Sequence, residues 1–254
     1  MLLCIDIGNT NIVFGVYKGD ELVNSFILET NHFKTVDEYG LRFMEMIKYM
    51  GYEQKAIAGV IIASVVPQLD GVFTNMILKY IKVEPLFVNT GIKTGINVKL
   101  DSPKQLGADL LVGAVAAVNK YNAPIIVIDM GTAITFTYVN ENKELLGGII
   151  VPGIKTGYSS LIKKTSRLEE VNLEEPKSVV GKDTVSAIQS GMIFGTSSLI
   201  DGLIRQIKNE KGDCPVVITG GESRFVLNSI KEKVYYEANL MLEGLKYIYN
   251  KNKK

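Results

Sequence analysis

The first residues able to do chemistry form an Asp-Ile-Gly-Asn-Thr motif that follows a short apolar run near the start of the chain. Asp6 ends this run, and a carboxylate at the end of a buried strand faces the sheet edge where α/β proteins bind ligands. Gly8 permits a tight turn. The backbone amides of the next three residues, Asn9, Thr10 and Asn11, can then face a phosphate. Because Asp6 repels phosphate, we expect it to hold a hydrated Mg²⁺ that bridges to the phosphate. Taken alone, the motif is better explained as an ordinary turn whose aspartate accepts local amide hydrogen bonds.

A second motif, Asp-Met-Gly-Thr, begins at Asp129 and repeats this chemistry with Gly131 and Thr132. The two aspartates are 123 positions apart, and at this offset several flanking residues match: Ile5 with Ile128, Gly8 with Gly131, Glu21 with Glu144, and Leu22 with Leu145. Chance could supply two Asp-x-Gly triplets, but it rarely places them equivalently in two matching strings. The repetition predicts a duplicated chain in which two turns hold a triphosphate from both sides, as in actin-like kinases.

A third motif, Thr-Gly-Gly-Glu, follows an apolar run that ends at Thr219. Two glycines, Gly220 and Gly221, would let a flat ligand approach the end of this strand closely. The motif is therefore a candidate for the turn that contacts adenosine. An ordinary strand-to-helix connection explains the same residues nearly as well.

Asp109 is the only charged side chain between Lys104 and Lys120, within a predicted helix. No cation lies three or four positions from it, so no ion pair along the helix explains its presence. A carboxylate on an apolar helix is unfavourable unless it meets a partner or solvent in a cleft. Asp109 could cap another element or face water. We favour a general base, because phosphoryl transfer to an alcohol needs a group that accepts the hydroxyl proton.

The elements that must position these residues occur as two similar strings. Strands are expected at residues 2–7, 12–17, 22–28, 60–66, 124–129, 134–139, 145–151 and 216–219. Helices are expected after Thr35, where Glu38 completes a capping box, and at residues 67–80, 102–120, 183–207 and 238–249. Each string begins with a strand, an Asp-x-Gly turn and a hairpin. We therefore predict an α/β protein with two similar halves, residues 1–118 and 119–254.

Composition excludes several other classes of protein. The 254 residues are 46% hydrophobic and 22% charged, as in globular proteins. The 28 basic and 27 acidic residues leave no basic surface for nucleic acid. No apolar run approaches the ~20 residues that span a bilayer, and the first residues do not resemble a signal peptide. Cys4 and Cys214 are expected to be buried thiols. These features predict a cytoplasmic protein without nucleic acid or membrane partners.

Over almost its whole length the sequence resembles the type III pantothenate kinase family. The matching stretches are residues 6–11, 63–67, 107–109, 129–133, 147–148, 152–153, 181–184, 219–221 and 242–245. Several are common individually, but in this order and spacing they are highly specific. The resemblance implies a duplicated ribonuclease-H-like (actin-like ATPase) fold with a nucleotide cleft between the halves. It also implies phosphorylation of pantothenate by ATP, the first step of coenzyme A biosynthesis.

The resemblance further implies roles on the nucleotide side. Asp6, Asn9 and Thr10 would serve the nucleotide phosphates and Mg²⁺. Asp129 would hold a monovalent cation, K⁺ or NH₄⁺, beside the phosphates, and Thr132 would bind phosphate.

On the acceptor side, the resemblance places pantothenate against Gly107, Ala108 and Asp109, with Asp109 as the catalytic base. Family members are typically homodimers, and Thr184 would reach pantothenate across the dimer interface.

Two acceptor-side positions depart from the family. The family usually has an arginine near the substrate carboxylate, directly after the aspartate, where this chain has Leu110. It commonly has a tyrosine shortly before an Asp-x-Pro stretch, where this chain has Leu100. Losing an arginine removes a charge-assisted contact worth roughly 1.5–3 kcal/mol. The alternatives to pantothenate kinase activity are a related kinase with a changed acceptor, a non-catalytic nucleotide-binding regulatory protein and an actin-like filament protein.

Overall fold

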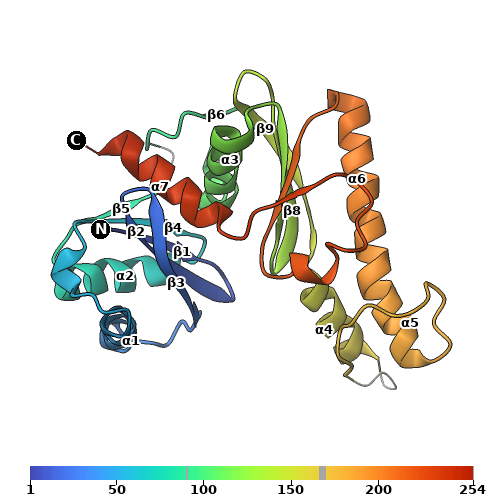
Figure 1. The fold of residues 1–254 in the computed structure, drawn as a ribbon, viewed down its shortest axis with the longest axis horizontal. Helices are drawn as coiled ribbons and strands as arrows, with labels where there is room; N and C mark the ends of the chain where they lie inside the picture. The colour runs from blue at the N-terminus through green and yellow to red at the C-terminus, as the bar shows by residue number, and fades with distance from the viewer. Residues whose placement is uncertain (90, 166–169, 254) are drawn as a thin grey trace. The chain divides into compact units, whose positions relative to one another are not determined.

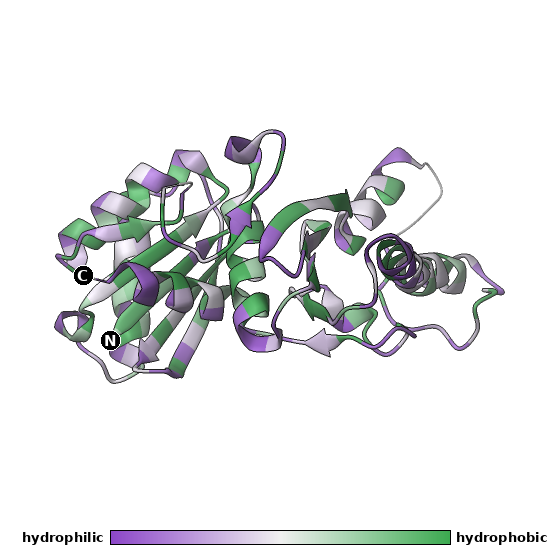
Figure 2. Ribbon diagram, turned by 90° about the horizontal axis from the view of Figure 1, so that it is seen from above, coloured by the Kyte–Doolittle hydropathy of each residue, from purple (hydrophilic) through white to green (hydrophobic). Residues whose placement is uncertain are grey.

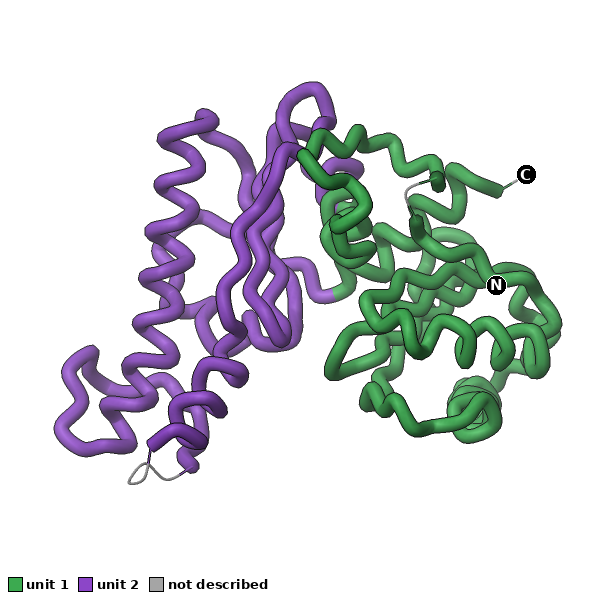
Figure 3. Tube along the Cα trace, turned by 180° about the vertical axis from the view of Figure 1, so that it is seen from behind, with its two compact units in different colours: residues 1–116, 239–254 green, residues 117–238 purple. Residues whose placement is uncertain are grey.

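The computed structural model describes residues 1–89, 91–165 and 170–253. The chain divides into two compact units (Figure 3). Unit 1 comprises Met1–Ala116 and Asn239–Lys254, and unit 2 comprises Ala117–Ala238. Within the described residues, no helix is both long enough and apolar enough to span a membrane.

Unit 1 is built on a sheet whose strands have the order β3-β2-β1-β4-β5 (Figure 1). These strands are β1 (Leu2–Ile7), β2 (Asn11–Lys18), β3 (Glu21–Glu29), β4 (Gly59–Ser64) and β5 (Pro85–Phe87). β1 pairs antiparallel with β2 and parallel with β4. The register places Asp6 beside Ala63 and Ile7 beside Ser64. The carboxyl ends of β1 and β4 therefore meet at one edge of the sheet, where the first motif begins.

Alternate residues of β1 enter two hydrophobic clusters, one on each face of the sheet. Ile5 belongs to the cluster formed with α1 (Val36–Tyr49) and α2 (Pro67–Tyr80). Cys4 belongs to the cluster formed with α3 (Ala108–Tyr121) and α7 (Leu240–Asn252). Hydrophobic residues, green in Figure 2, are concentrated along the strands. Because side chains alternate along a strand, Asp6 lies on the same face as Cys4, the face covered by α3 and α7.

Unit 2 repeats the topology of unit 1. Its strands follow the order β11-β10-β7-β8-β9, which is the order of unit 1 read from the other edge. They are β7 (Ile125–Met130), β8 (Ala133–Val139), β9 (Glu144–Pro152), β10 (Val216–Thr219) and β11 (Tyr235–Tyr236). β7 pairs antiparallel with β8 and parallel with β10, as β1 does with β2 and β4. The shared topology confirms the duplication predicted from the repeated motifs.

The helices of unit 2 are α4 (Ile154–Lys164), α5 (Thr184–Ser190) and α6 (Thr196–Lys211). Ile200 and Ile204 of α6 pack in one cluster with Ile126 and Ile128 of β7. The short elements of the described chain are β6 (Asn97–Val98), a π-helical turn at Gly191–Gly195, and 3₁₀ turns at Gln54–Ala56, Pro103–Gln105 and Ser223–Phe225.

One helix predicted as continuous is divided in the structure, and a second contains a widened turn. Pro103 begins a 3₁₀ turn, Leu106 is extended with φ −66° and ψ 122°, and α3 starts only at Ala108. The extended backbone at Leu106 ends the turn and lets its side chain pack against the cluster below α3. The helix expected at residues 183–207 is confirmed, because the backbone stays helical from α5 into α6 through one π-helical turn. Its end residues, Gly191 and Gly195, lack the side chains that would crowd a widened turn.

The last helix, α7, belongs to unit 1, although the sequence analysis places it in the second half of the chain (Figure 3). Leu242, Leu245 and Ile248 of α7 are buried in the cluster that contains Cys4 and Ile61 of the first sheet. The division into compact units therefore groups α7 with unit 1, because the apolar side of α7 covers the sheet of that unit. The boundaries of the duplicated halves, 1–118 and 119–254, stay a prediction.

Candidate active site

The first motif forms the turn between β1 and β2. The Gly8 N–H donates to the Asn11 carbonyl oxygen at 3.0 Å, which closes the turn. The Thr30 hydroxyl donates to the Gly8 carbonyl at 2.7 Å, and the Thr30 N–H donates to the Thr10 carbonyl at 3.0 Å. Asn9, Thr10 and Asn11 are exposed, while Asp6 is half-buried at the end of its strand. The turn is thus held in place and open to a ligand, and its binding of phosphate stays a prediction.

Asp109 lies in the first turn of α3 and is half-buried. The Leu110 N–H donates to its Oδ1 at 2.8 Å. Burial raises the pKa of Asp109, and the hydrogen bonds from backbone amides offset only part of this effect. A Cβ atom at Gly107 would lie 2.3 Å from Asp109 Oδ1 and 3.7 Å from the Val65 side chain. The Val65 N–H in turn donates to the Ile7 carbonyl at the end of β1. The glycine therefore leaves the space that the carboxylate occupies, close to the edge that carries the first motif.

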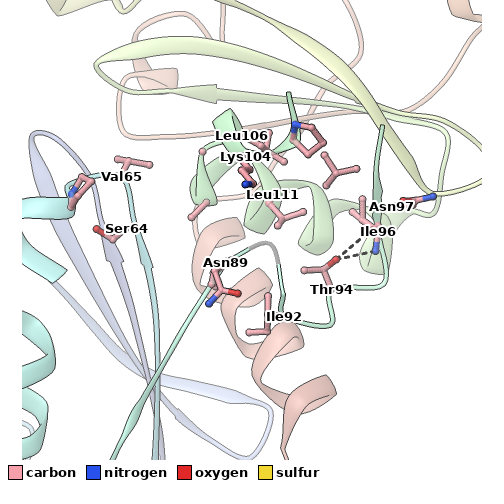
Figure 4. Close-up of a pocket in the computed structure, with 16 residues that line it drawn as sticks. Ser64, Val65, Asn89, Ile92, Thr94, Ile96, Asn97, Lys104, Leu106 and Leu111 are labelled. Carbon is pink, nitrogen blue, oxygen red and sulfur yellow. Dashed lines mark hydrogen bonds between the residues drawn. The ribbon is translucent and has the colours of Figure 1, made fainter. Parts of the chain in front are cut away.

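A cavity of about 770 Å³ lies within unit 1 beside this segment (Figure 4). Three segments line it: the residues that end β4 and begin α2, the loop after β5, and the residues that lead into α3. Its polar lining residues are Ser64, Asn89, Thr94, Asn97 and Lys104, and its main apolar ones are Val65, Val88, Ile92, Ile96, Leu106 and Leu111. Of the predicted acceptor residues, Gly107 and Ala108 line the cavity. Asp109, Leu100 and Leu110 are not among its lining residues.

Unit 2 brings the second and third motifs together. β7 and β10 are parallel neighbours, and their register places Asp129 beside Thr219. Gly220 has φ +93°, and a Cβ atom there would lie 2.4 Å from the Met130 carbonyl oxygen and 2.5 Å from Asp129 Oδ1. The Glu222 N–H donates to the Met130 carbonyl at 3.0 Å. Only glycine permits this close approach, so the second Asp-x-Gly turn and the Gly-Gly turn form one site in unit 2.

The start of α4 also joins this site, which the sequence analysis did not predict. The Gly153 N–H donates to the Thr132 carbonyl at 3.0 Å. The Lys155 N–H, in the first turn of α4, donates to Glu222 Oε2 at 3.3 Å. Burial raises the pKa of Glu222, and its hydrogen bonds with the α4 amides partly offset this rise. The sequence signal for this contact is the Pro-Gly pair at residues 152–153, directly before α4.

Thr184 is the first residue of α5 and is exposed. The preceding residue, Asp183, caps the helix by accepting a hydrogen bond from the Ser186 N–H at 2.9 Å. Thr184 therefore has a fixed backbone and an accessible position. Its role toward a substrate held by a second subunit stays a prediction.

The Asp6 carboxylate is suited to a metal ion that arrives bound to a nucleotide. Within the described residues, no three histidine, cysteine, aspartate or glutamate side chains gather into a metal site. Mg²⁺ in phosphate-transfer sites is commonly held by one or two carboxylates together with water and substrate phosphates. A single carboxylate beside an exposed turn, as at Asp6, fits this donor set.

Comparisons with known proteins agree with the fold and the motifs. The family model described as type III pantothenate kinase matches residues 2–206. A type III pantothenate kinase from Finegoldia magna is 42% identical over 257 residues, covering 100% of this chain and 98% of the relative. One from Exiguobacterium sp. is 38% identical over 254 residues and covers both chains completely.

Solved structures support the fold alone. The activator of the 2-hydroxyisocaproyl-CoA dehydratase from Clostridium difficile, with bound ADPNP, superposes with a TM-score of 0.59 at 13% identity, covering 99% of this chain and 94% of that one. The Lmo2764 protein from Listeria monocytogenes superposes with a TM-score of 0.56 at 13% identity, covering 100% and 99%. The duplicated ribonuclease-H-like fold is therefore confirmed, and the family match over most of the chain shows that it belongs to the type III pantothenate kinase family.

Proposed function

We propose that this chain transfers the γ-phosphoryl group of ATP to pantothenate, the first step of coenzyme A biosynthesis. The observation that carries the proposal is the end-to-end similarity to type III pantothenate kinases. The unit 1 site supports it, because a half-buried carboxylate adjoins a cavity of about 770 Å³, a volume typical of small-molecule sites.

In this proposal Asp109 is the general base. The primary hydroxyl oxygen of pantothenate attacks the γ-phosphorus of ATP while the bond from that phosphorus to the β–γ bridging oxygen breaks. ADP leaves, and the hydroxyl proton passes to the Asp109 carboxylate. Burial raises the pKa of Asp109, which makes it a stronger base than an exposed aspartate. The Leu110 N–H holds the carboxylate in place.

The three glycine-containing turns would serve ATP. Mg²⁺ beside Asp6 would offset the charge of the phosphates, and a monovalent cation, K⁺ or NH₄⁺, would lie beside Asp129. The exposed positions of Thr10 and Thr132 support contacts with phosphate oxygens. The residues assigned to ATP are Asp6, Gly8, Asn9, Thr10, Asn11, Gly131, Thr132, Gly220 and Gly221.

We further infer that the protein acts as a homodimer in the cytoplasm. Thr184 of one subunit would contact pantothenate bound in the other, and its exposed place at the start of α5 supports this role.

The proposal is tested by coupled ADP release with Mg²⁺, K⁺ and ATP, with and without pantothenate and with a panel of other small alcohols. We expect ADP formation that depends on pantothenate. ADP formed only with another alcohol would indicate a changed acceptor, the alternative that Leu100 and Leu110 favour. ATP binding without turnover across the panel would indicate a regulatory protein.

A further inference from the structure

The cavity in unit 1 has an unbalanced charge. Lys104 is the only charged side chain among its described lining residues. Within the described part of the chain, no carboxylate forms an ion pair with Lys104. Lys104 is an exposed residue. The described lining of this cavity therefore offers a ligand one positive charge and no carboxylate, which favours an anionic group at the Lys104 end.

The remaining lining is suited to a short chain with both alkyl and amide groups. Val65, Leu106 and Leu111 supply apolar surface. Asn89 and Thr94 supply polar groups, and the Thr94 hydroxyl already donates to the Ile96 carbonyl at 3.1 Å. In the view of Figure 4, Ser64 and Val65 lie to one side of Lys104, and Ile96 and Asn97 lie to the other.

The two ends of such a ligand would meet different chemistry. Gly107 lines the cavity, and the Asp109 carboxylate lies directly against this glycine. Lys104 lines the same cavity three residues earlier in the chain. An acceptor whose alcohol is placed near Gly107 can therefore extend toward Lys104 with its opposite end.

We propose that Lys104 binds the carboxylate of the acceptor and is the residue that makes this site select an acid. The proposal rests on the proposed function, because pantothenate carries a primary alcohol at one end and a carboxylate at the other. Lys104 is a specificity-determining residue here, since it touches the substrate at the end remote from the reacting hydroxyl. It should affect binding of the acceptor and leave the chemical step unchanged.

The experiment compares pantothenate with pantothenol, in which a hydroxymethyl group replaces the carboxylate. Initial rates of ADP release give KM and kcat for both acceptors in the unaltered protein and in Lys104→Met. We expect the unaltered protein to have a KM for pantothenate about tenfold lower than for pantothenol, as loss of a charge-assisted contact predicts. Lys104→Met should raise the KM for pantothenate to that of pantothenol and leave both kcat values unchanged.

Two further variants serve as controls. Lys104→Arg keeps the positive charge and should retain most of the preference for pantothenate. Lys93→Met removes an exposed lysine from the loop that lines the cavity, although Lys93 itself does not line it, and should change nothing. Calorimetric titration of pantothenate into protein loaded with a non-hydrolysable ATP analogue should show the same tenfold loss of affinity in Lys104→Met.

The outcomes separate this inference from the proposed function. If the unaltered protein phosphorylates pantothenate and Lys104→Met keeps its preference over pantothenol, Lys104 does not bind the carboxylate. If the unaltered protein phosphorylates neither acceptor, the proposed function fails and this inference fails with it. Raising the ionic strength should weaken the preference in the unaltered protein only, because salt screens an exposed ion pair.

Discussion

At the scale of single residues, the site depends on a carboxylate whose surroundings favour its protonated form. The pKa of Asp109 is raised by burial, so this group retains its proton to a higher pH in the folded protein than in the unfolded chain. A base of this kind accepts a proton more readily once it is ionised. When kcat/KM is measured against pH, its fall on the acid side should therefore have an apparent pKa above the ordinary aspartate value of about 3.9.

Asp109→Asn tests this role directly. We expect turnover to fall at least about a hundredfold, because the amide cannot accept the proton, while ATP affinity stays nearly unchanged. Steady-state rates and equilibrium binding of an ATP analogue give the two quantities. Turnover within a few-fold of the unaltered protein would remove Asp109 from the role of base.

The same variant should change stability in a pH-dependent way. Because its folded-state pKa is raised, protonated Asp109 contributes stability that is complete below the unfolded-state pKa and lost as pH rises through the folded-state value. Asp109→Asn should therefore have a higher Tm than the unaltered protein at pH 7, and the difference should shrink below about pH 4. Thermal unfolding across this range measures it, and a lower Tm at pH 7 would contradict the burial argument.

Gly107 is predicted to position this carboxylate. In Gly107→Ala the new methyl group would lie 2.3 Å from Asp109 Oδ1, so the carboxylate must move. A displacement of about 1 Å at a reacting group can lower the rate about a hundredfold, and we expect kcat to fall by at least tenfold. The matched control is Gly71→Ala in α2, where a methyl group meets nothing within 4 Å and a helical alanine is favoured. Equal kcat values in both variants would contradict this role.

The positions of the motif turns and of the buried thiols could be predicted from the sequence, whereas the roles of the site residues stay predictions. The Asp-x-Gly turns lie where the strand pattern placed them, and Cys4 and Cys214 are buried free thiols as expected. Lys104 was missed, because a single lysine beside a proline has no periodic or motif signal. It lines the cavity from the 3₁₀ turn at Pro103–Gln105, where the sequence predicted an α-helix.

At the scale of elements, the Gly-Gly turn after β10 depends on contact between two strands. Gly220 and Gly212 both have positive φ, +93° and +94°, but only Gly220 has backbone and side-chain atoms within reach of an added Cβ. Alanine should therefore introduce backbone strain of about 1–3 kcal/mol at either position. At Gly220 it should also force β7 and β10 apart and raise the KM for ATP.

The two alanine variants separate strain from close approach. Thermal unfolding and the KM for ATP are measured for each. We expect Gly220→Ala to lose more stability than Gly212→Ala and to be the variant whose ATP kinetics change. If both variants have the same Tm and the same KM for ATP, the contact between the Gly-Gly turn and Asp129 contributes neither to stability nor to the use of ATP.

The ends of helices and strands could be predicted from the sequence only where neighbouring residues form a recognisable motif. The capping box of Thr35 and Glu38 starts α1 as predicted, since both of its hydrogen bonds involve neighbouring residues. β5 and β11 escaped prediction because they have only 3 and 2 residues, too few to show an alternating pattern. The start of α3 was predicted too early because Ser-Pro at residues 102–103 initiates a 3₁₀ turn instead.

At the scale of the whole molecule, the last residues of the chain complete the first unit. Leu245 is fully buried in the cluster with β1 and β4, although more than 180 residues separate it from β4. Sequence repetition could not predict this, because α7 follows the second set of strands. Unit 1 is therefore built from two segments of the chain, Met1–Ala116 and Asn239–Lys254.

Leu245→Ala should cost about 2–5 kcal/mol of unfolding free energy, because it leaves a cavity between α7 and the sheet. The matched control is Leu41→Ala in α1, a helical leucine that is 59% exposed and should cost less than about 1 kcal/mol. Urea unfolding gives both values, and hydrogen exchange should be faster in β1 of the Leu245 variant. Similar costs at both positions would contradict the role of α7.

The central claim, phosphorylation of pantothenate, is tested most directly by following the transferred group itself. The protein is incubated with pantothenate, Mg²⁺, K⁺ and ATP labelled with ¹⁸O in its γ-phosphoryl group, and the products are identified by mass spectrometry. We predict labelled 4′-phosphopantothenate in amounts equal to ADP, and almost none with Asp109→Asn. ADP that accumulates with the label in inorganic phosphate, or no ADP at all, would contradict the claim.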